Sequence, residues 1–416
     1  MKNNRSIFPL LWIMLFDHTS LNITFPVLTL LFFDAQSSLF AADTSHAIRS
    51  MWYGLCLSVP HMVNIVMTPL LSSLSDEFGR KKILLIGTFG AFLFAITCAF
   101  GIVWGLFSVM FFGLIIRGAF SRTNPIAQAV IGDISSRDRK VLHMGYLQTS
   151  IAIGACIGPF IGGYVANQFF FAQLNFSVPF FLAAIFAAIS FILTMIVFKE
   201  TLVVQRATAP WAAFNFSVIK KIFSNPDVLR ISVILLLSQI SWSLYYQFIP
   251  PTLKTILNFD AHQLGWFVGL IAFWLALATS LGIKILDQFF SMKEILFLSL
   301  YLLLIGLLLT VLLCFLHLEG KWTLLIWFAA IPVAVGDVIA FSCLTALYSN
   351  AVELHEQGKV MGVCLTVIAV TWALTGLLGG FLMSAYTLLP LIVTPVGIML
   401  AIGLLHSRLG LRMNIN

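Results

Sequence analysis

The chain is divided into long apolar stretches, and their length is the strongest constraint on its fold. Each stretch holds roughly 20 residues with few charges, which is the length of helix that crosses a ~30 Å hydrocarbon layer. The stretches are continuous and do not alternate with a period of two, so a β-barrel is not expected. We predict twelve membrane-spanning helices, at about residues 7–33, 48–72, 83–103, 105–131, 142–166, 177–198, 229–251, 263–286, 294–316, 322–349, 358–384 and 386–406.

The composition agrees with a membrane protein and excludes a soluble one. Only 9% of the residues are charged, against about 25% in soluble domains. The first apolar stretch is followed by eleven more and lacks a small-residue cleavage site, so we expect a retained span and not a signal peptide. The six cysteines lie in apolar stretches without metal-ligand spacing, which predicts buried thiols, no disulfides and no metal site.

The basic residues are placed unevenly along the chain. With the N-terminus in the cytoplasm, 18 of the 23 lysines and arginines fall in cytoplasmic segments and 3 in outer segments. This is the positive-inside bias, and it predicts a multi-pass protein with both termini in the cytoplasm. The net charge of +7 is thereby explained without nucleic acid as a partner. Short loops favour a bacterial inner (plasma) membrane, and we expect a monomer.

The loops are short except between the sixth and seventh stretches. Residues 199–228 are more polar and basic, and WAAFNFSVIKKIF within them mixes aromatics with paired lysines, as in a helix on the membrane surface. We predict an N-terminal six-helix bundle (1–200), a cytoplasmic linker (201–228) and a C-terminal six-helix bundle (229–416). The expected fold is all-α, with the two bundles related by pseudo-symmetry.

The two halves resemble each other at a nearly constant offset. The matching pairs, separated by 220, 219 and 218 residues, are Asp133 and Glu353, Lys140 and Lys359, and Gly158 and Gly376. Such an offset indicates duplication, and in transporters built from repeats the site lies at the repeat interface near the membrane midplane.

The loop after the second stretch reads SSLSDEFGRKK (72–82). Gly79 permits a tight turn and Asp76 can face Arg80 or a helix N-terminus. The stretch resembles G-x-x-x-D-R-x-G-R-[KR], the loop signature of the major facilitator superfamily. It matches at Asp76, Gly79, Arg80 and Lys81 and departs at Ser72 and Glu77. With twelve stretches and a central linker, the chain is identified as a member of that family; the alternative is an ordinary surface turn.

The fifth stretch contains GACIGPFIGG, in which Gly154, Gly158 and Gly162 recur every four residues beside Pro159. Small residues at this spacing let helices approach closely. The pattern is similar to G-x-x-x-G-P-x-x-G-G of the family's antiporters, which implies a role in leak control and conformational change. A purely packing role is the alternative. We group Asp133 with these gating residues.

The first stretch carries an acid, Asp17, in the middle of LLWIMLFDHTSLNITFPVL. Acids at membrane depth are costly and usually mark an ion or substrate path. The segment resembles D-x-x-x-x-x-x-x-x-P-x-L in the first span of tetracycline and multidrug exporters, with Pro26 matching. By that resemblance Asp17 is a candidate protonation switch. The alternative is a structural acid bonded to Arg117 or His18.

Two further charges lie at membrane depth. Arg117 heads a stripe with Ser121, Asn124 and Gln128 on one helical face, while Arg122 points away from that face. Asp337 follows Arg117 by 220 residues, so the two could form a pair across a cavity that substrate or proton breaks. Asp337 could instead be an isolated neutral acid. We predict Asp17, Arg117 and Asp337 as proton-coupling residues.

Polar and aromatic residues elsewhere in the stretches are candidates for lining the substrate path. Aromatics beside amides suit a planar or amphiphilic ligand, although a membrane histidine is more often a packed hydrogen-bonder. The candidates are Asn22, His61, Asn64, Asn124, Gln128, Gln239, Trp242 and Tyr246.

The sequence therefore predicts a secondary transporter and not an enzyme. No phosphate-binding loop, zinc constellation or nucleophile elbow is present, so no cofactor, hydrolysis or ATP-driven pumping is expected. The leading hypothesis is proton-coupled export of a small amphiphilic molecule by alternating access, with the lipid bilayer, protons and the substrate as partners. The alternatives are uptake or export of a specific metabolite (a carboxylate, an amino-acid-like compound or a siderophore) and a non-transporting membrane sensor.

Overall fold

The computed structural model describes residues 7–41, 43–120, 123–136, 139–166, 176–202, 226–317, 320–350 and 357–406. Helices make up almost all of these residues. Their bounds are α1 Ile7–Phe33, α2 His46–Phe78, α3 Arg80–Val103, α4 Phe107–Phe120, α5 Thr123–Ile134, α6 Lys140–Ala166, α7 Val178–Ile196, α9 Pro226–Ile256, α10 Ala261–Leu277, α11 Ile283–Leu286, α12 Met292–Phe315, α13 Leu324–Asn350, α14 Gln357–Ala385 and α15 Leu389–His406.

The helices confirm the predicted all-α membrane architecture. Ten of them, in the part of the chain just given, are long and apolar enough to cross a membrane. The eighth predicted stretch is composite and comprises α10, a π-helical segment Ala278–Gly282 and α11. The fourth is described as α4 and α5, on either side of residues 121 and 122, which lie outside the described residues. Prolines occur inside α1 and α2, among others, which membrane helices tolerate because neighbouring groups satisfy the freed carbonyls.

The chain forms two compact units. Unit 1 comprises Met1–Thr44, Val59–Phe214 and Phe259–Leu270, and unit 2 comprises Ser45–Ser58, Asn215–Asn258 and Ile271–Asn416. The predicted surface helix at WAAFNFSVIKKIF falls outside the described residues, so the bundle and linker boundaries stay a prediction.

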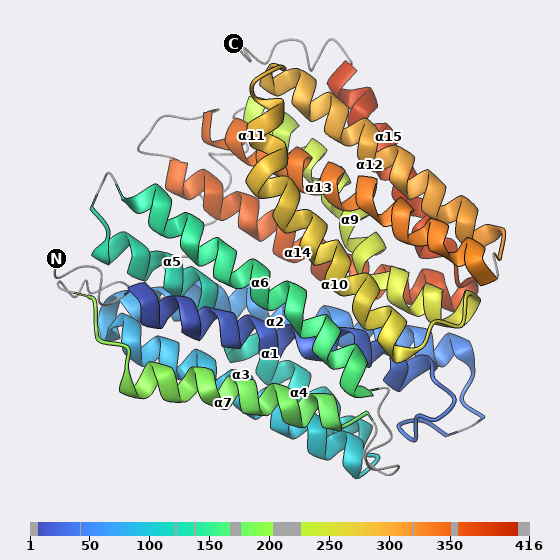
Figure 1. Ribbon diagram of the computed structural model, residues 1–416, viewed down its shortest axis with the longest axis horizontal. Coiled ribbons are helices and arrows are strands. Elements are labelled where there is room, and N and C mark those ends of the chain that lie inside the picture. Colours follow the sequence, from blue (N-terminus) through green and yellow to red (C-terminus); the bar gives the residue numbers. More distant parts are fainter. Residues whose placement is uncertain are drawn as a thin grey trace. The chain divides into compact units, whose positions relative to one another are not determined.

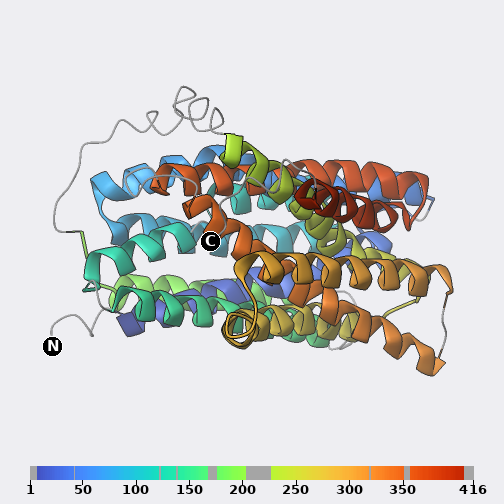
Figure 2. The same cartoon turned by 90° about the horizontal axis from the view of Figure 1, so that it is seen from above.

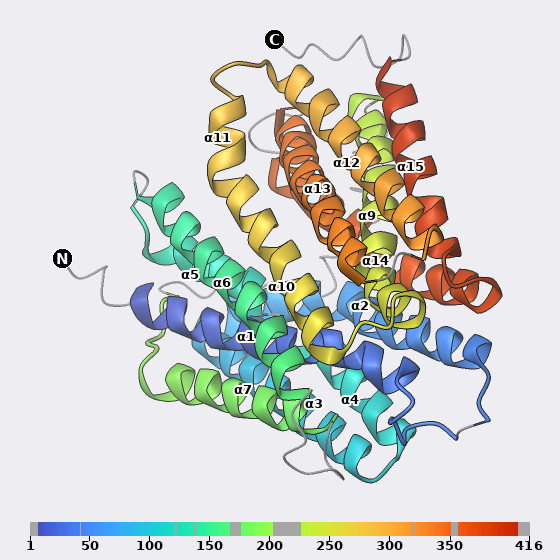
Figure 3. The same cartoon turned by 45° about the vertical axis from the view of Figure 1, so that its right-hand side comes forward.

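In unit 1, α1 packs between α6 and α7, and α3 packs against α4 and α7 (Figure 1). Buried apolar side chains fill the space between these helices, among them Leu10, Met14 and Leu84. In unit 2, α12 lies between α13 and α15, and α15 packs on α9 (Figure 3). Seen from above, the helices within each unit run in roughly a common direction (Figure 2). Each unit thus packs long helices whose inner faces carry a few polar side chains.

Candidate functional site

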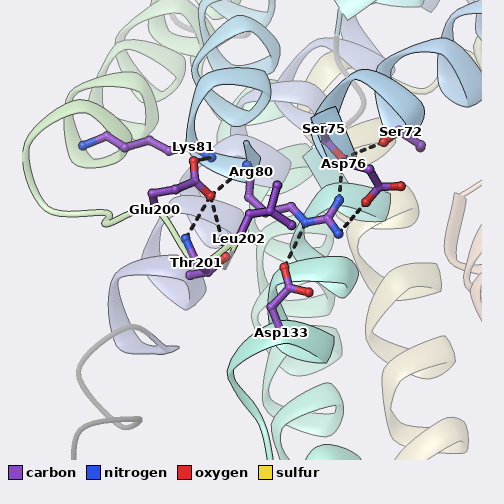
Figure 4. Close-up of polar contacts among 9 residues, drawn as sticks. All are labelled: Ser72, Ser75, Asp76, Arg80, Lys81, Asp133, Glu200, Thr201 and Leu202. Atoms are coloured by element: carbon purple, nitrogen blue, oxygen red, sulfur yellow. Dashed lines mark hydrogen bonds and ion pairs between the residues drawn. The ribbon is translucent and has the colours of Figure 1, made fainter. Parts of the chain in front are cut away.

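Arg80 is the centre of an ion-pair cluster at one end of unit 1 (Figure 4). Its guanidinium is largely buried and uses all three nitrogens. Nε lies 2.9 Å from Asp133 Oδ2, Nη2 lies 2.6 Å from Asp76 Oδ1, and Nη1 donates to Ser75 Oγ at 2.6 Å. Because the planar guanidinium fixes these donor directions, Arg80 joins the end of α2, the start of α3 and the last turn of α5. Three predicted gating residues are therefore brought together.

The start of α3 is capped by Glu200, which follows α7 (Figure 4). Glu200 Oε1 accepts from the backbone N–H of Arg80 at 2.9 Å, and Oε2 accepts from that of Lys81 at 3.0 Å. The N–H groups of Thr201 and Leu202 also donate to Oε1, each at 2.9 Å. Burial alone would raise the pKa of this carboxyl, but the four backbone donors outweigh it and lower the pKa.

Gly79 is required at this turn for two reasons. Its φ of 103° lies in the region that favours glycine. A Cβ there would also lie 2.5 Å from Glu200 Oε2, so a side chain would displace the capping carboxylate. The sequence offered no local signal for Glu200 or Ser75, because each is defined by a partner on another element.

Asp17 lies in the middle of α1 and is fully buried. Thr123, from α5, is also buried, and its hydroxyl donates to Asp17 Oδ2 at 2.5 Å. Among the described residues Asp17 Oδ1 has no hydrogen-bond partner. Bonding of Arg117 or His18 to this carboxyl stays a prediction. The donor described here is Thr123, which the sequence did not single out.

Hydroxyl and amide groups next to Asp17 fix α1 in unit 1. Ser20 Oγ donates to the carbonyl of Ala183 on α7 at 2.8 Å, and Ser190 Oγ of α7 donates to the carbonyl of Ile13 at 3.1 Å. Asn22 Nδ2 donates at 2.8 Å to the carbonyl of His18 on its own helix. The two bonds made by Ser20 and Ser190 hold the helix that carries the acid against α7.

The glycine stripe of α6 packs directly on α1. A Cβ at Gly154 would lie 2.7 Å from the carbonyl oxygen of Leu15, and a Cβ at Gly158 would lie 2.8 Å from that of Thr19. At Gly162 the obstacle is the carbonyl oxygen of Ile23. Pro159 lies on a second face of α6, which packs on the part of α10 that belongs to unit 1. A Cβ added at Gly265 of α10 would lie 2.5 Å from the carbonyl oxygen of Pro159. The motif thus lets backbone meet backbone along the segment of α1 that contains Asp17.

Residues 7–376 match the family described as Major Facilitator Superfamily. The chain belongs to this superfamily. It is a multi-pass integral membrane protein of a family of transporters, not of enzymes, and the predicted family is confirmed.

Curated relatives include several tetracycline resistance proteins. The class H protein of Pasteurella multocida is 29% identical over 199 residues, which is 48% of this chain and 45% of that protein. The class D protein of Salmonella ordonez is 24% identical over 80% of each chain. The human protein named Hippocampus abundant transcript 1 protein is 24% identical over 74% of this chain and 61% of its own. The matched stretch spans about half the length of the class H relative.

Solved structures with the same fold come from several kinds of superfamily transporter. A human organic anion transporter superposes with a TM-score of 0.69 at 16% identity, covering 98% of this chain and all (100%) of that one. A D-xylose-proton symporter gives a TM-score of 0.74 at 14% identity, covering 96% of each chain. At these identities the likeness establishes the fold alone.

The polar stripe predicted on the fourth stretch is described in two parts, one on α4 and one on α5. Arg117 lies on α4 with its guanidinium carbon 5.4 Å from the ring centroid of Phe94, a cation–π geometry. Gln128 donates to Asn124 at 3.1 Å on α5. Ser121 and Arg122, between the two helices, lie outside the described residues.

In unit 2, Asp337 is buried on α13, and its pairing with Arg117 stays a prediction. Trp242 and Tyr246 of α9 lie with ring centroids 5.4 Å apart, and Tyr246 lies 5.9 Å from Trp372 of α14. Gln239 is buried on the same helix. The structure therefore groups the predicted aromatics of α9 and adds Trp372 to them.

Gln247 of α9 was missed by the sequence interpretation. Its amide nitrogen donates to Thr375 Oγ1 at 3.2 Å, while its carbonyl oxygen is buried without a hydrogen-bond partner in the described part of the chain. On α2, Asn64 is buried and His61 is partly buried, and their part in a substrate path stays a prediction. Glu353 and the side chain of Lys359 lie outside the described residues.

Proposed function

We propose that this chain is a proton-coupled exporter of a small amphiphilic molecule that works by alternating access. The observation that carries the proposal is the buried Asp17, whose carboxyl accepts a hydrogen bond from the neutral hydroxyl of Thr123. A charged carboxylate at membrane depth is costly unless opposite charges or several hydrogen-bond donors stabilise it. An acid placed there is suited to take up and release a proton as its surroundings change.

Two further features support alternating access. The Arg80 cluster is made of ion pairs at the ends of three helices, so a rearrangement of those helices can break and remake it. At Gly154, Gly158 and Gly162 the α1–α6 contact brings the two backbones together, as small residues at this spacing allow. Relatives named tetracycline resistance proteins favour a drug-like substrate.

We further propose an inner (plasma) membrane location with both termini in the cytoplasm. The positive-inside bias of the sequence supports this orientation. In this orientation the Arg80 cluster lies on the cytoplasmic side.

The aromatic side chains of Trp242, Tyr246 and Trp372 could stack on the face of a planar substrate.

The test is efflux from cells that express the full chain. Tetracycline and the cationic dye ethidium serve as probes, with and without a protonophore. Export of either probe should stop when the proton gradient collapses, and Asp17→Asn should abolish active export at equal protein level. Asp43→Asn is the matched control, because Asp43 is exposed outside the helices. Export that continues in the protonophore contradicts the coupling; movement only of small carboxylates would favour the metabolite alternative.

A further inference from the structure

The helix α5 contacts both of the ionic features of unit 1. Thr123, at its first position, donates to Asp17. Asp133, in its last turn, accepts from Arg80. Ten residues separate Thr123 from Asp133, which corresponds to about 15 Å along a helix at 1.5 Å per residue. One helix therefore makes both the contact to the acid in α1 and the contact to the arginine at the start of α3.

The Thr123 hydroxyl has little freedom to move independently of α5. Threonine is stiff about χ1 because it is branched at Cβ. Its methyl group lies against α3, where a Cβ added at Gly87 would be 3.1 Å from Thr123 Cγ2. The side chain is 1% exposed, so water cannot readily replace it as donor to Asp17. When the hydrogen bond to Asp17 changes, the Thr123 side chain therefore moves together with α5, not by rotation about its own χ1 bond.

We propose that Thr123 is a positioning residue that couples the protonation state of Asp17 to the position of α5, and through Asp133 to the Arg80 cluster. The inference rests on the proposed role of Asp17. A carboxylate accepts the Thr123 hydroxyl in a charge-assisted bond, and a proton added to Asp17 weakens that bond. α5 is then held less tightly at Thr123, and Asp133 shifts against Arg80. Coupling is reciprocal, so loss of the Asp133–Arg80 pair changes proton binding at Asp17.

The helices around Asp17 carry other titratable and charged groups that a pH series must take into account. On α1 itself the neighbour is His18. α3 carries Arg80, Lys81, Lys82 and Cys98, α4 carries Arg117, α5 carries Asp133, and the described residues of α7 carry none. α6 carries Lys140, His143, Tyr146, Cys156 and Tyr164, and His143 Nδ1 lies 2.7 Å from Ser135 Oγ, directly after α5. Arginine does not lose its proton in proteins, and thiols are weakly acidic. The histidines His18 and His143 are the competing groups, and Asp17→Asn separates both from Asp17, because a step due to either histidine would persist in that variant.

The experiment is hydrogen–deuterium exchange of the purified full chain in detergent across a pH series, corrected for intrinsic exchange rates. The reporter is the set of α5 amides from residues 123 to 134. Thr123→Val removes the hydroxyl at nearly constant volume, and Thr123→Ser retains it. In the wild type, protection of α5 should fall about tenfold as Asp17 becomes protonated, the difference between a charge-assisted and a neutral hydrogen bond. Thr123→Ser should keep this step and Thr123→Val should lose it.

The outcomes separate the proposal from the function on which it rests. A step that is absent in Asp17→Asn but unchanged in Thr123→Val overturns the role of Thr123 and leaves Asp17 as the titrating group. A step that persists in Asp17→Asn overturns the proposed proton site itself. Should Thr123→Val fail to fold, the pH-dependent fall in α5 protection is compared between Thr123→Ser and Asp133→Asn. The proposal requires that this fall is retained in Thr123→Ser and changed in Asp133→Asn. An equal step in the two overturns the link.

Discussion

Replacement of Gly158 by alanine tests whether close backbone contact between α1 and α6 is required. The added Cβ would lie 2.8 Å from the carbonyl oxygen of Thr19, 2.8 Å from Asn22 Cβ and 3.0 Å from its carbonyl carbon. Ordinary van der Waals contacts begin near 3.4 Å. The helices must therefore separate by about half an ångström, and overpacking of this kind costs about 1–3 kcal/mol.

Gly145→Ala is the matched control on the same helix. No heavy atom lies within 4 Å of a Cβ at Gly145, so this change should be neutral or stabilise α6 by up to about 1 kcal/mol through helix propensity. The assay is thermal unfolding of the purified variants in one detergent, followed by probe export per folded protein. Gly158→Ala should unfold at a lower temperature than Gly145→Ala and export more slowly. Equal behaviour of the two variants would refute the close-contact argument.

Three further changes test the other end of unit 1 and the α3–α5 contact. Glu200→Gln should lower stability by about 1 kcal/mol near neutral pH, because the charged helix cap is lost. The pKa of Glu200 is lowered in the folded chain, so the stabilisation by its carboxylate is complete above the ordinary glutamate pKa and disappears as the pH falls through the lowered value. Thermal melts of variant and wild type should therefore converge in acid, and a gap that stays constant with pH would contradict this account. Arg80→Lys keeps the charge but not the three directed donors, and should lower stability by about 2 kcal/mol in the same melts. Lys82→Arg, at an exposed neighbouring position, is the control and should leave the melting temperature unchanged. Gly87→Ala should push on Thr123 from α3 and shift the pH at which export is half-maximal, whereas an unshifted pH profile would separate Thr123 from the proton step.

Hydropathy and charge placement predicted the membrane fold because both are local properties of the chain. The length of each stretch is set by the bilayer, and no knowledge of the partner helix is needed to recognise it. Composition does not report where a helix changes its winding, so the π-helical segment Ala278–Gly282 was not predicted.

The site was predictable only where its residues carry a local motif or an unusual cost. Asp17 was found because an acid among apolar residues is rare, and Asp76 with Arg80 because they share a short loop. Thr123, Glu200 and Gln247 were missed because threonine, glutamate and glutamine are unremarkable in their own segments. Each acquires its role from a partner more than 100 residues away in the chain, such as Asp17 for Thr123 and Arg80 for Glu200.

Proton-driven transport by the purified chain in lipid vesicles tests the central claim most directly. A pH gradient is imposed across the vesicles, and accumulation of tetracycline or ethidium against its own gradient is followed. Wild type and Asp43→Asn should accumulate the exported probe only while the pH gradient lasts, and Asp17→Asn should only equilibrate it. Accumulation by Asp17→Asn at the wild-type level, or accumulation by the wild type without a pH gradient, would contradict Asp17 as the proton-coupling residue.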